Sequence, residues 1–198
     1  MKHKHLVTFG SVMVVAWVLG TSLLVYFWPR LVNNVYKRAI LDRGFGDGPV
    51  PINTLYTEPQ ALFAEPLRTS LPPGSSSLMT VGVNHDTLLT VGWLDLSKGP
   101  EVLQVPNFSG RYYSVQFTDP FDVGFAYVGT RTSGTQAGDY LVTGPGWQGS
   151  VPHGMKQISS PSNSVLVLGR TLVYDDSDLP TAYRLAKQIQ LVPLSRRR

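Results

Sequence analysis

The chain has 198 residues, a length that suits one membrane-spanning element and one folded domain of about 100–150 residues. Apolar residues make up 42% of it and charged residues 15%, and its 19 glycines and 15 prolines are typical of a turn-rich domain with more strand than helix. Because the chain contains no cysteine, disulfides, thiolate metal sites and thiol nucleophiles are excluded.

The net charge of +4 does not indicate a nucleic-acid-binding protein, because the basic residues gather at the two ends of the chain. Residues 1–43 hold six of them and residues 196–198 hold three. Positions 44–195 contain eight basic and twelve acidic residues, so the part expected to fold is acidic. We therefore expect no nucleic-acid partner, and we expect the basic ends to contact anionic lipid or to set membrane topology.

Residues 1–30 are predicted to form a transmembrane anchor. The segment Leu6–Trp28 contains 23 residues without a charge, and as a helix it would be about 34 Å long, against about 30 Å of bilayer hydrocarbon. A cleaved signal peptide is the alternative, but this segment exceeds the roughly 7–15 apolar residues typical of one, and no A-x-A-like site follows. Tyr26, Trp28 and Arg30 would form an interfacial belt.

The charges that flank the apolar segment favour opposite orientations of the anchor. Lys2 and Lys4 favour an amino terminus in the cytoplasm, whereas the more numerous basic residues after the segment favour the reverse: Arg30, Lys37, Arg38 and Arg43. The basic, signal-like start of the chain contains no acidic residue, which leads us to expect the folded domain on the outer side.

Residues 31–78 are predicted to connect the anchor to the domain. We expect a juxtamembrane helical extension that ends at Gly44, a linker over residues 44–51, and a short helix with Thr57 as its N-cap. Residues 71–77 (LPPGSSS) form a second linker by composition.

Residues 79–198 are predicted to form the β-domain, because apolar residues alternate and turn residues recur at intervals of about ten. We expect strands at 79–84, 87–96, 101–105, 111–118, 124–129, 139–143, 155–158 and 164–174, the last with a break at Gly169. A closing helix with Asp178 as N-cap would end before Pro193. The fold class is therefore mainly β, an antiparallel β-sandwich or jelly-roll-like domain with a short C-terminal helix, preceded by one transmembrane helix.

The tetrad Asn84-His85-Asp86-Thr87 has the groups of a hydrolytic or metal site. Neighbouring residues on an extended strand point to opposite faces, so His85 and Asp86 would share a site only at a turn. The alternative is an Asx-turn or strand-edge cap. Asn84 and Asp86 remain ligand-binding candidates.

A second polar and aromatic group joins Arg111-Tyr112-Tyr113 to Gln116 and Asp119. Alternation places Tyr113 on one face of the strand and Tyr112 on the other, so one tyrosine can be core while the other lines a groove. Tyr112 and Asp119 are candidates here, with a purely structural role as the alternative.

Two arginines complete the candidate set. Arg131 lies in the glycine-flanked segment 129–134, which suits either an anion cradle or a hairpin loop but lacks a nucleotide-binding motif. Arg170 interrupts an apolar strand, so it lies at an edge or forms an ion pair, with these candidate partners: Asp86, Asp95, Asp119 and Asp122. No spacing of histidines or carboxylates suits a metal, and no serine-nucleophile motif occurs, so we expect no metal and no cofactor and assign no catalytic residue.

Seven blocks occur in order along the chain: GVNHDTL, GWLDLSKGP, RYYSVQFTDP, FAYVGTRTSGTQAGDY, GPGWQG, SPSNSVLVLGRTLV and LAKQIQLVPLS. Together they resemble the bacterial domain-of-unknown-function family 1254 over about residues 45–195. The resemblance implies a predominantly β domain, often followed in longer chains by a second β-rich domain, family 1214, and no generally assigned activity. His85 stands where the longer members often have Asn or Arg, which argues against a catalytic histidine.

The resemblance also implies a location and a partner. We expect a single-pass protein of the bacterial inner membrane whose domain faces the periplasm. Because the chain stops after LVPLS, we expect a separately encoded protein to supply the second domain. The predicted function is a membrane-anchored binding or assembly module. The alternative is an envelope enzyme or small-ligand receptor whose pocket uses six side chains: Asn84, Asp86, Tyr112, Asp119, Arg131 and Arg170.

Overall fold

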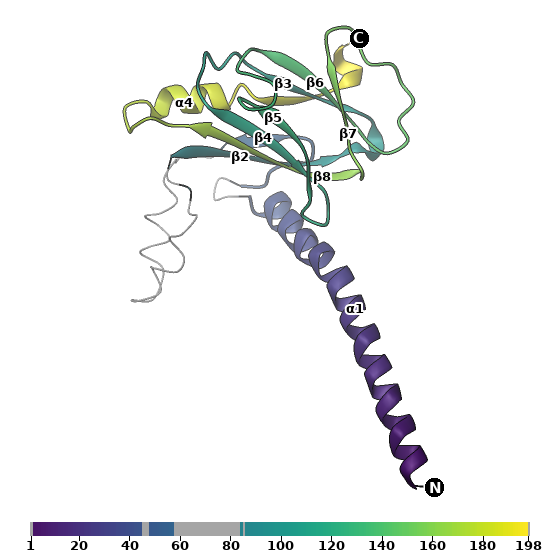
Figure 1. The fold of residues 1–198 in the computed structure, drawn as a ribbon. Helices are drawn as coiled ribbons and strands as arrows, with labels where there is room; N and C mark the ends of the chain where they lie inside the picture. Colours follow the sequence, from purple (N-terminus) through teal and green to yellow (C-terminus); the bar gives the residue numbers. More distant parts are fainter. Residues whose placement is uncertain (1, 45–47, 58–83, 85, 198) are drawn as a thin grey trace.

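The computed structural model describes residues 2–44, 48–57, 84 and 86–197. A long helix, α1 (Lys2–Asp42), projects from a β-domain, as Figure 1 shows. Large apolar side chains are exposed along it from Phe9 to Tyr36, and by length and composition it could cross a membrane. The predicted anchor and juxtamembrane extension are thus parts of a single helix, which continues through Pro29.

Two sheets form the β-domain. The first has the order β1 (Leu55–Thr57), β2 (Thr87–Asp95), β8 (Ser164–Leu172), β4 (Tyr113–Thr118) and β5 (Gly124–Gly129). The second has the order β7 (Lys156–Ser159), β6 (Gly138–Thr143), β3 (Glu101–Val105) and β9 (Gln190–Pro193). All neighbouring strands are antiparallel except β6 and β7. The predicted mainly β fold is confirmed.

The main core lies between the two sheets, and strand alternation explains its composition. On β4 the side chains of Tyr113, Val115 and Phe117 are buried, so Tyr113 is the tyrosine that belongs to the core. Phe108 stacks on Tyr113 with ring centroids 4.1 Å apart and an interplanar angle of 9°. The helix α4 (Leu179–Ala186) closes the end of the domain by packing Ala182 and its neighbours against β2 and β8.

The end of α1 packs against the outer face of the first sheet. Ile40 and Val50 form a cluster with Val91 and Trp93 of β2. Lys37 donates a hydrogen bond to Ser164 Oγ at 3.1 Å, and its ammonium lies 5.6 Å from the centre of the Trp93 ring. The domain is therefore attached to α1 by apolar packing and polar contacts as well as by the chain itself.

Most predicted strands occur, with some differences at their ends. The strand predicted at 111–118 begins at Tyr113, and the last predicted strand ends at Leu172 without a break at Gly169. A Cβ on Gly169 would stand 2.9 Å from Thr90 Cβ, so the glycine permits close approach of β2 and β8. The closing helix ends at Ala186, and Gln190–Pro193 is strand β9 instead.

Two strands lie where the sequence predicted other structure, because each pairs with a distant strand. β1 lies within the predicted connecting segment, and it pairs with β2. β9 pairs with β3. The helix predicted from Thr57 and the strand predicted at 79–84 fall almost entirely on residues 58–83, outside the described part of the chain.

Candidate functional site

Three of the six predicted site residues line one pocket. Tyr112, Arg131 and Arg170 line a cavity of about 350 Å³.

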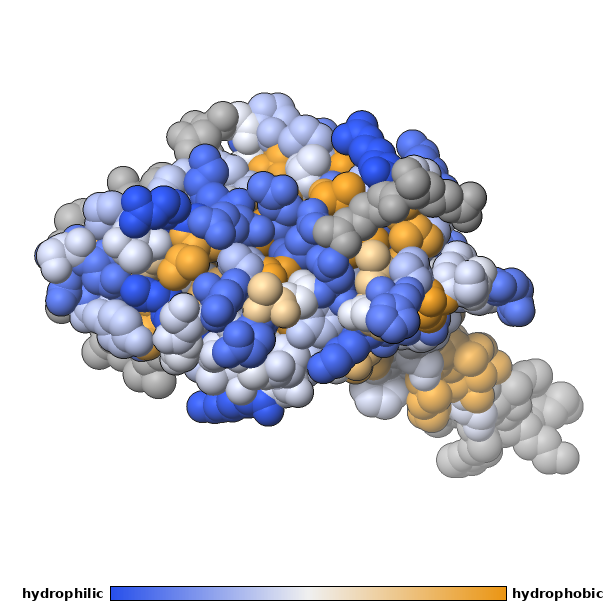
Figure 2. Space-filling model, turned by 90° about the horizontal axis from the view of Figure 1, so that it is seen from above, coloured by the Kyte–Doolittle hydropathy of each residue, from blue (hydrophilic) through white to orange (hydrophobic). Residues whose placement is uncertain are grey.

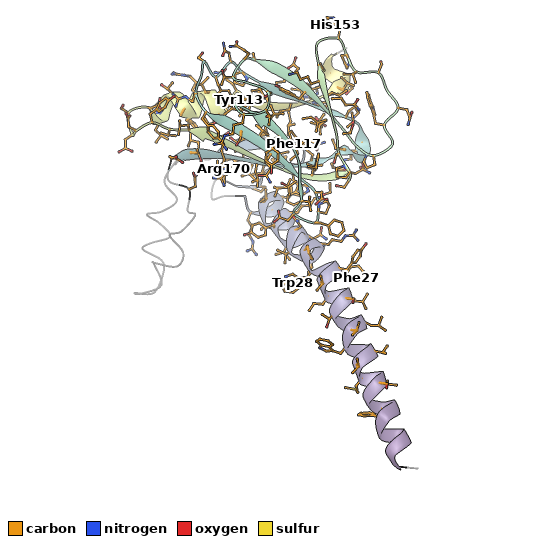
Figure 3. All side chains as sticks on the ribbon, in the orientation of Figure 1. Phe27, Trp28, Tyr113, Phe117, His153 and Arg170 are labelled. Carbon is orange, nitrogen blue, oxygen red and sulfur yellow. The ribbon has the colours of Figure 1, made fainter. Side chains whose placement is uncertain are left out.

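 This cavity lies on the outer face of the first sheet. It is also lined by Ser114, Gln116, Tyr127 and Thr132. Figure 3 shows Arg170 at the layer formed by β2 and β8, the side of the domain on which α1 lies. The polar groups of three strands and one loop thus converge.

Strand alternation and register bring these side chains together. Because Tyr113 of β4 faces the core, its neighbours Tyr112 and Ser114 face outward. Arg170 of β8 is paired with Ser114 of β4, and Ser114 is paired in turn with Gly129 of β5. A Cβ on Gly129 would stand 2.5 Å from Tyr113 O, so a glycine is needed where β4 and β5 approach each other.

The loop that carries Arg131 is a closed turn. The backbone amides of Thr132, Ser133 and Gly134 all donate to Gly129 O, at 3.0, 2.8 and 3.2 Å. Ser133 Oγ also accepts from Gly129 N at 3.0 Å. Because these amides are used inside the turn, the structure supports the hairpin-loop interpretation of this segment and not the anion cradle. Arg131 and Thr132 of this turn line the pocket.

The two guanidinium groups of the pocket carry uncompensated charge within the described structure. Neither Arg131 nor Arg170 forms an ion pair with a described residue, whereas Arg111 pairs with Asp178. Arg131 lies over the ring of Tyr112, with 5.7 Å between its Cζ atom and the ring centroid. The residues that line the cavity include no carboxylate and no histidine. The pocket is therefore suited to an anionic group and offers no general base that is active near neutral pH.

No ion pair joins Arg170 to any of the proposed aspartates among the described residues, and two of these aspartates make local hydrogen bonds instead. Asp95 caps the short 3-10 helix Leu96–Lys98 through Ser97, and these hydrogen bonds lower its pKa. Asp119 accepts from the amides of Phe121 and Val123 at 2.8 and 3.0 Å, which shapes the β4–β5 loop. Arg170 is exposed and lines the pocket.

The other predicted candidates do not reach this pocket. Asn84 Oδ1 accepts hydrogen bonds from the amide and hydroxyl of Thr87, and Asn84 Nδ2 donates to Thr87 O. This is the strand-edge cap that the sequence allowed as an alternative. Asp86 is exposed beside it, and its carbonyl accepts from Val173 N at 2.7 Å. His85 lies outside the described residues, and no group of three or more potential metal ligands occurs among the described ones.

Sequence reasoning missed one buried ion pair. Arg111, which is 8% exposed, donates to both carboxylate oxygens of Asp178 at 2.6 and 2.7 Å and to Leu172 O at 2.7 Å. Asp178 precedes α4 as predicted, but its side chain makes no capping hydrogen bond. The Arg111 guanidinium lowers the pKa of Asp178 to about 2. The two residues are 67 positions apart, so no local sequence signal could reveal them.

A buried carboxyl group was also missed. Glu101 is 4% exposed at the start of β3, and burial raises its pKa to about 7, against the lowering effects of Arg196 and of the hydrogen bond from Asn53. Asn53 Nδ2 donates to Glu101 Oε1 at 3.0 Å, and Asn53 Oδ1 accepts from Asp95 N at 2.7 Å. This asparagine links the segment before β1 to β2 and β3.

Comparisons with known proteins support the architecture of the domain. The sequence model of the family described as "Protein of unknown function (DUF1254)" matches residues 65–193. No curated protein matches the chain.

The comparison with solved structures gives two matches. The VPA0106 protein from Vibrio parahaemolyticus has a TM-score of 0.63 and 24% identity, with 87% of this chain and 37% of that chain covered. An uncharacterized protein from Burkholderia cenocepacia has a TM-score of 0.38 and 14% identity, with 68% and 39% covered. The chain thus spans well under half the length of either. The first similarity shows a shared fold.

Proposed function

We propose that this chain, which belongs to the DUF1254 family of proteins of unknown function, is a membrane-anchored binding module that takes up an anionic ligand between Tyr112, Arg131 and Arg170. The observation that carries the proposal is the presence of two arginines without an ion-pair partner among the described residues, in one pocket without a carboxylate. An unpaired guanidinium gains most from a phosphate or carboxylate, which it can bind through two hydrogen bonds.

The remaining lining groups support recognition of such a ligand. Ser114 and Thr132 offer hydroxyl groups, and the aromatic rings of Tyr112 and Tyr127 form apolar walls. A ligand with a negatively charged end and a flat or apolar body would satisfy both kinds of surface. Because the lining residues include no histidine or carboxylate, we propose binding in this pocket and not catalysis.

The test is anion-dependent stabilisation of the full chain in detergent. We expect pyrophosphate or a small dicarboxylate to raise the unfolding temperature, since a ligand that binds only the folded state stabilises it. The variants Arg131→Ala and Arg170→Ala should lose this increase. Arg184→Ala is the matched control, because Arg184 is an exposed arginine of α4 outside the pocket. An equal increase in all four proteins, or none in the parent, would contradict the proposal.

We also propose that the helix crosses the inner membrane and that the domain faces the periplasm. The support is the long apolar helix, preceded by Lys2 and Lys4. An alkaline phosphatase fused after Arg198 should be active. A reporter that fluoresces only in the cytoplasm should stay dark at the same position, and the reverse pattern would refute this orientation.

A second candidate function is assembly with another protein that carries a β-domain. The described structure gives it one specific support: β7 and β9 are the edge strands of the second sheet, and such edges can pair with a strand of a partner. Purification of the full chain from its native host in mild detergent should recover a stoichiometric companion. Recovery of the monomer alone would count against assembly and would leave the anion pocket untouched.

A further inference from the structure

The loop between β4 and β5 lies beside α1 at the point where the uncharged part of the helix ends. Asn33 Nδ2 donates to Pro120 O at 3.0 Å. The Arg30 guanidinium lies 4.3 Å from the centre of the Phe121 ring and 4.9 Å from that of Tyr26. The rings of Tyr26 and Phe121 are 6.0 Å apart. The loop and the helix therefore share a small aromatic and cationic cluster.

The tip of this loop is held in a turn that exposes apolar side chains. The Asp119 carboxylate accepts from the amides of Phe121 and Val123, and Asp122 adopts a positive φ of 65°. Phe121 is 37% exposed and Val123 is 56% exposed. The hydrogen bonds of the turn hold these two side chains at the surface, where they can contact an apolar phase or partner.

A groove of about 510 Å³ separates the loop from the helix. Its walls are mainly apolar and aromatic: Trp28, Val32 and Tyr36 from α1, Phe121 from the loop and Leu166 from β8. Trp28 and Tyr36 are 57% and 63% exposed. Asn33 and Asp122 also line the groove, and its apolar part adjoins, at Trp28, the exposed apolar surface of the helix.

The position of Trp28 on α1 indicates the level at which the groove would lie relative to a membrane. Trp28 is the last residue of the uncharged segment, and tryptophan and tyrosine at the end of a membrane span lie at the level of the lipid headgroups. Phe121 is in contact range of Tyr26, so it lies at the same level. In contrast, the face of the domain that points away from α1 is mostly hydrophilic, as Figure 2 shows.

We propose that bilayer phospholipid fills this groove and that the β4–β5 loop is a second membrane contact of the protein. Phe121 and Val123 lie at the boundary between acyl chains and headgroups, and Arg30 lies within reach of lipid phosphate. The domain is then held against the bilayer at two points, with the outer face of the first sheet toward the lipid. The inference rests on the crossing of the membrane by α1 and is independent of the ligand of the anion pocket.

The experiment uses the full chain, whose lack of cysteine allows single labels without other substitutions. Phe121→Cys and Val123→Cys are each spin-labelled and reconstituted in liposomes of phosphatidylcholine and phosphatidylglycerol. Two controls bracket them: Gly20→Cys in the middle of the helix, and His153→Cys, which Figure 3 places on the opposite side of the domain. The accessibility of each label to oxygen and to a water-soluble nickel complex is then measured.

We expect the labels at positions 121 and 123 to lose accessibility to nickel and to gain accessibility to oxygen relative to the label at His153. If both labels match the one at His153 while the label at Gly20 is in lipid, the loop contact is overturned and the anchor stands. If the label at Gly20 also matches it, the anchor and the loop contact fail together. Val123→Cys keeps Phe121 in place, so its label reports on the loop without loss of the ring cluster. The unfolding midpoint of each variant shows that it is folded.

Discussion

The buried carboxyl group of Glu101 predicts a specific dependence of stability on pH. Its Oε1 atom accepts from Asn53 Nδ2 at 3.0 Å, and its Oε2 atom has no hydrogen-bond partner among the described residues. Burial raises its pKa from the ordinary value of 4.5 to about 7. The folded chain therefore keeps a proton on Glu101 over a range of pH in which the unfolded chain has lost it.

The sign and the size follow from this difference between the two pKa values. Between the unfolded value of 4.5 and the folded value of about 7, the folded state binds one more proton, so stability falls as pH rises through this window and then levels off. The difference of about 2.5, at about 1.4 kcal/mol for each pH unit, predicts a loss of about 3 kcal/mol. Glu101→Gln removes the ionisation and should make the variant more stable than the parent above pH 7 by up to this amount.

The measurement is urea unfolding of the full chain in nonionic detergent, followed by near-ultraviolet circular dichroism at about pH 5 and about pH 8. The difference in unfolding free energy between parent and Glu101→Gln isolates this carboxyl from other titrating groups. His153→Gln is a control substitution, because His153 is exposed and makes no contribution to the pKa shift of Glu101, and it should keep the parental dependence. A difference between parent and Glu101→Gln that is the same at both pH values would refute the reasoning.

Three further predictions concern packing and the buried ion pair. Asp178→Asn should lower the unfolding free energy by about 1–3 kcal/mol by leaving Arg111 unpaired. Because the pKa of Asp178 is lowered to about 2, this difference between parent and variant should vanish as pH falls through that value. Unfolding curves between about pH 2 and pH 5 can test this. Gly92→Ala should cost about 1–3 kcal/mol in urea unfolding, since its Cβ would stand 2.3 Å from Thr54 O, and a neutral result would show that the edge strand moves freely. Phe108→Ala should cost about 3–5 kcal/mol, because a fully buried ring is removed, and a loss below 1 kcal/mol would contradict the packing.

Much of the β-domain could be predicted because local signals mark its strands. The bounds predicted for β3 and β5 agree with the structure, since turn residues flank both strands. Alternation also explains the two faces of β2: Val91 and Trp93 pack toward α1, and Leu94 packs into the core between the sheets. These features depend on neighbouring residues, which a single sequence displays.

The missed elements depend on distant partners. β1 and β9 are short edge strands without a clear alternation of their own, and they form because β2 and β3 offer them hydrogen-bonding edges. The apolar spacing around Ile189 resembled a continuing helix, but Ile189 is buried in the core between the sheets, and the chain after it continues as β9. Tertiary packing thus prevails over local propensity.

The candidate site could be predicted only in part, because it too depends on the pairing of distant strands. The residue types of Tyr112, Arg131 and Arg170 marked them as candidates, but only the pairing of β8 with β4 and of β4 with β5 shows that they share a pocket. Two other candidates, Asn84 and Asp119, satisfy nearby backbone amides instead, as asparagine and aspartate often do.

The end of α1 and the proposed anion pocket lie on the same face of the first sheet, which bears on the nature of the ligand. On β8, Leu166 borders the groove beside α1, and Arg170 lies four residues farther on, about 13 Å along the strand. With α1 in a bilayer, the pocket opens on the lipid-facing side of the domain. A free anion would have to enter between the domain and the bilayer there, whereas a lipid headgroup is already present. The placement of the two arginines therefore favours a ligand that is delivered by the membrane or is part of it.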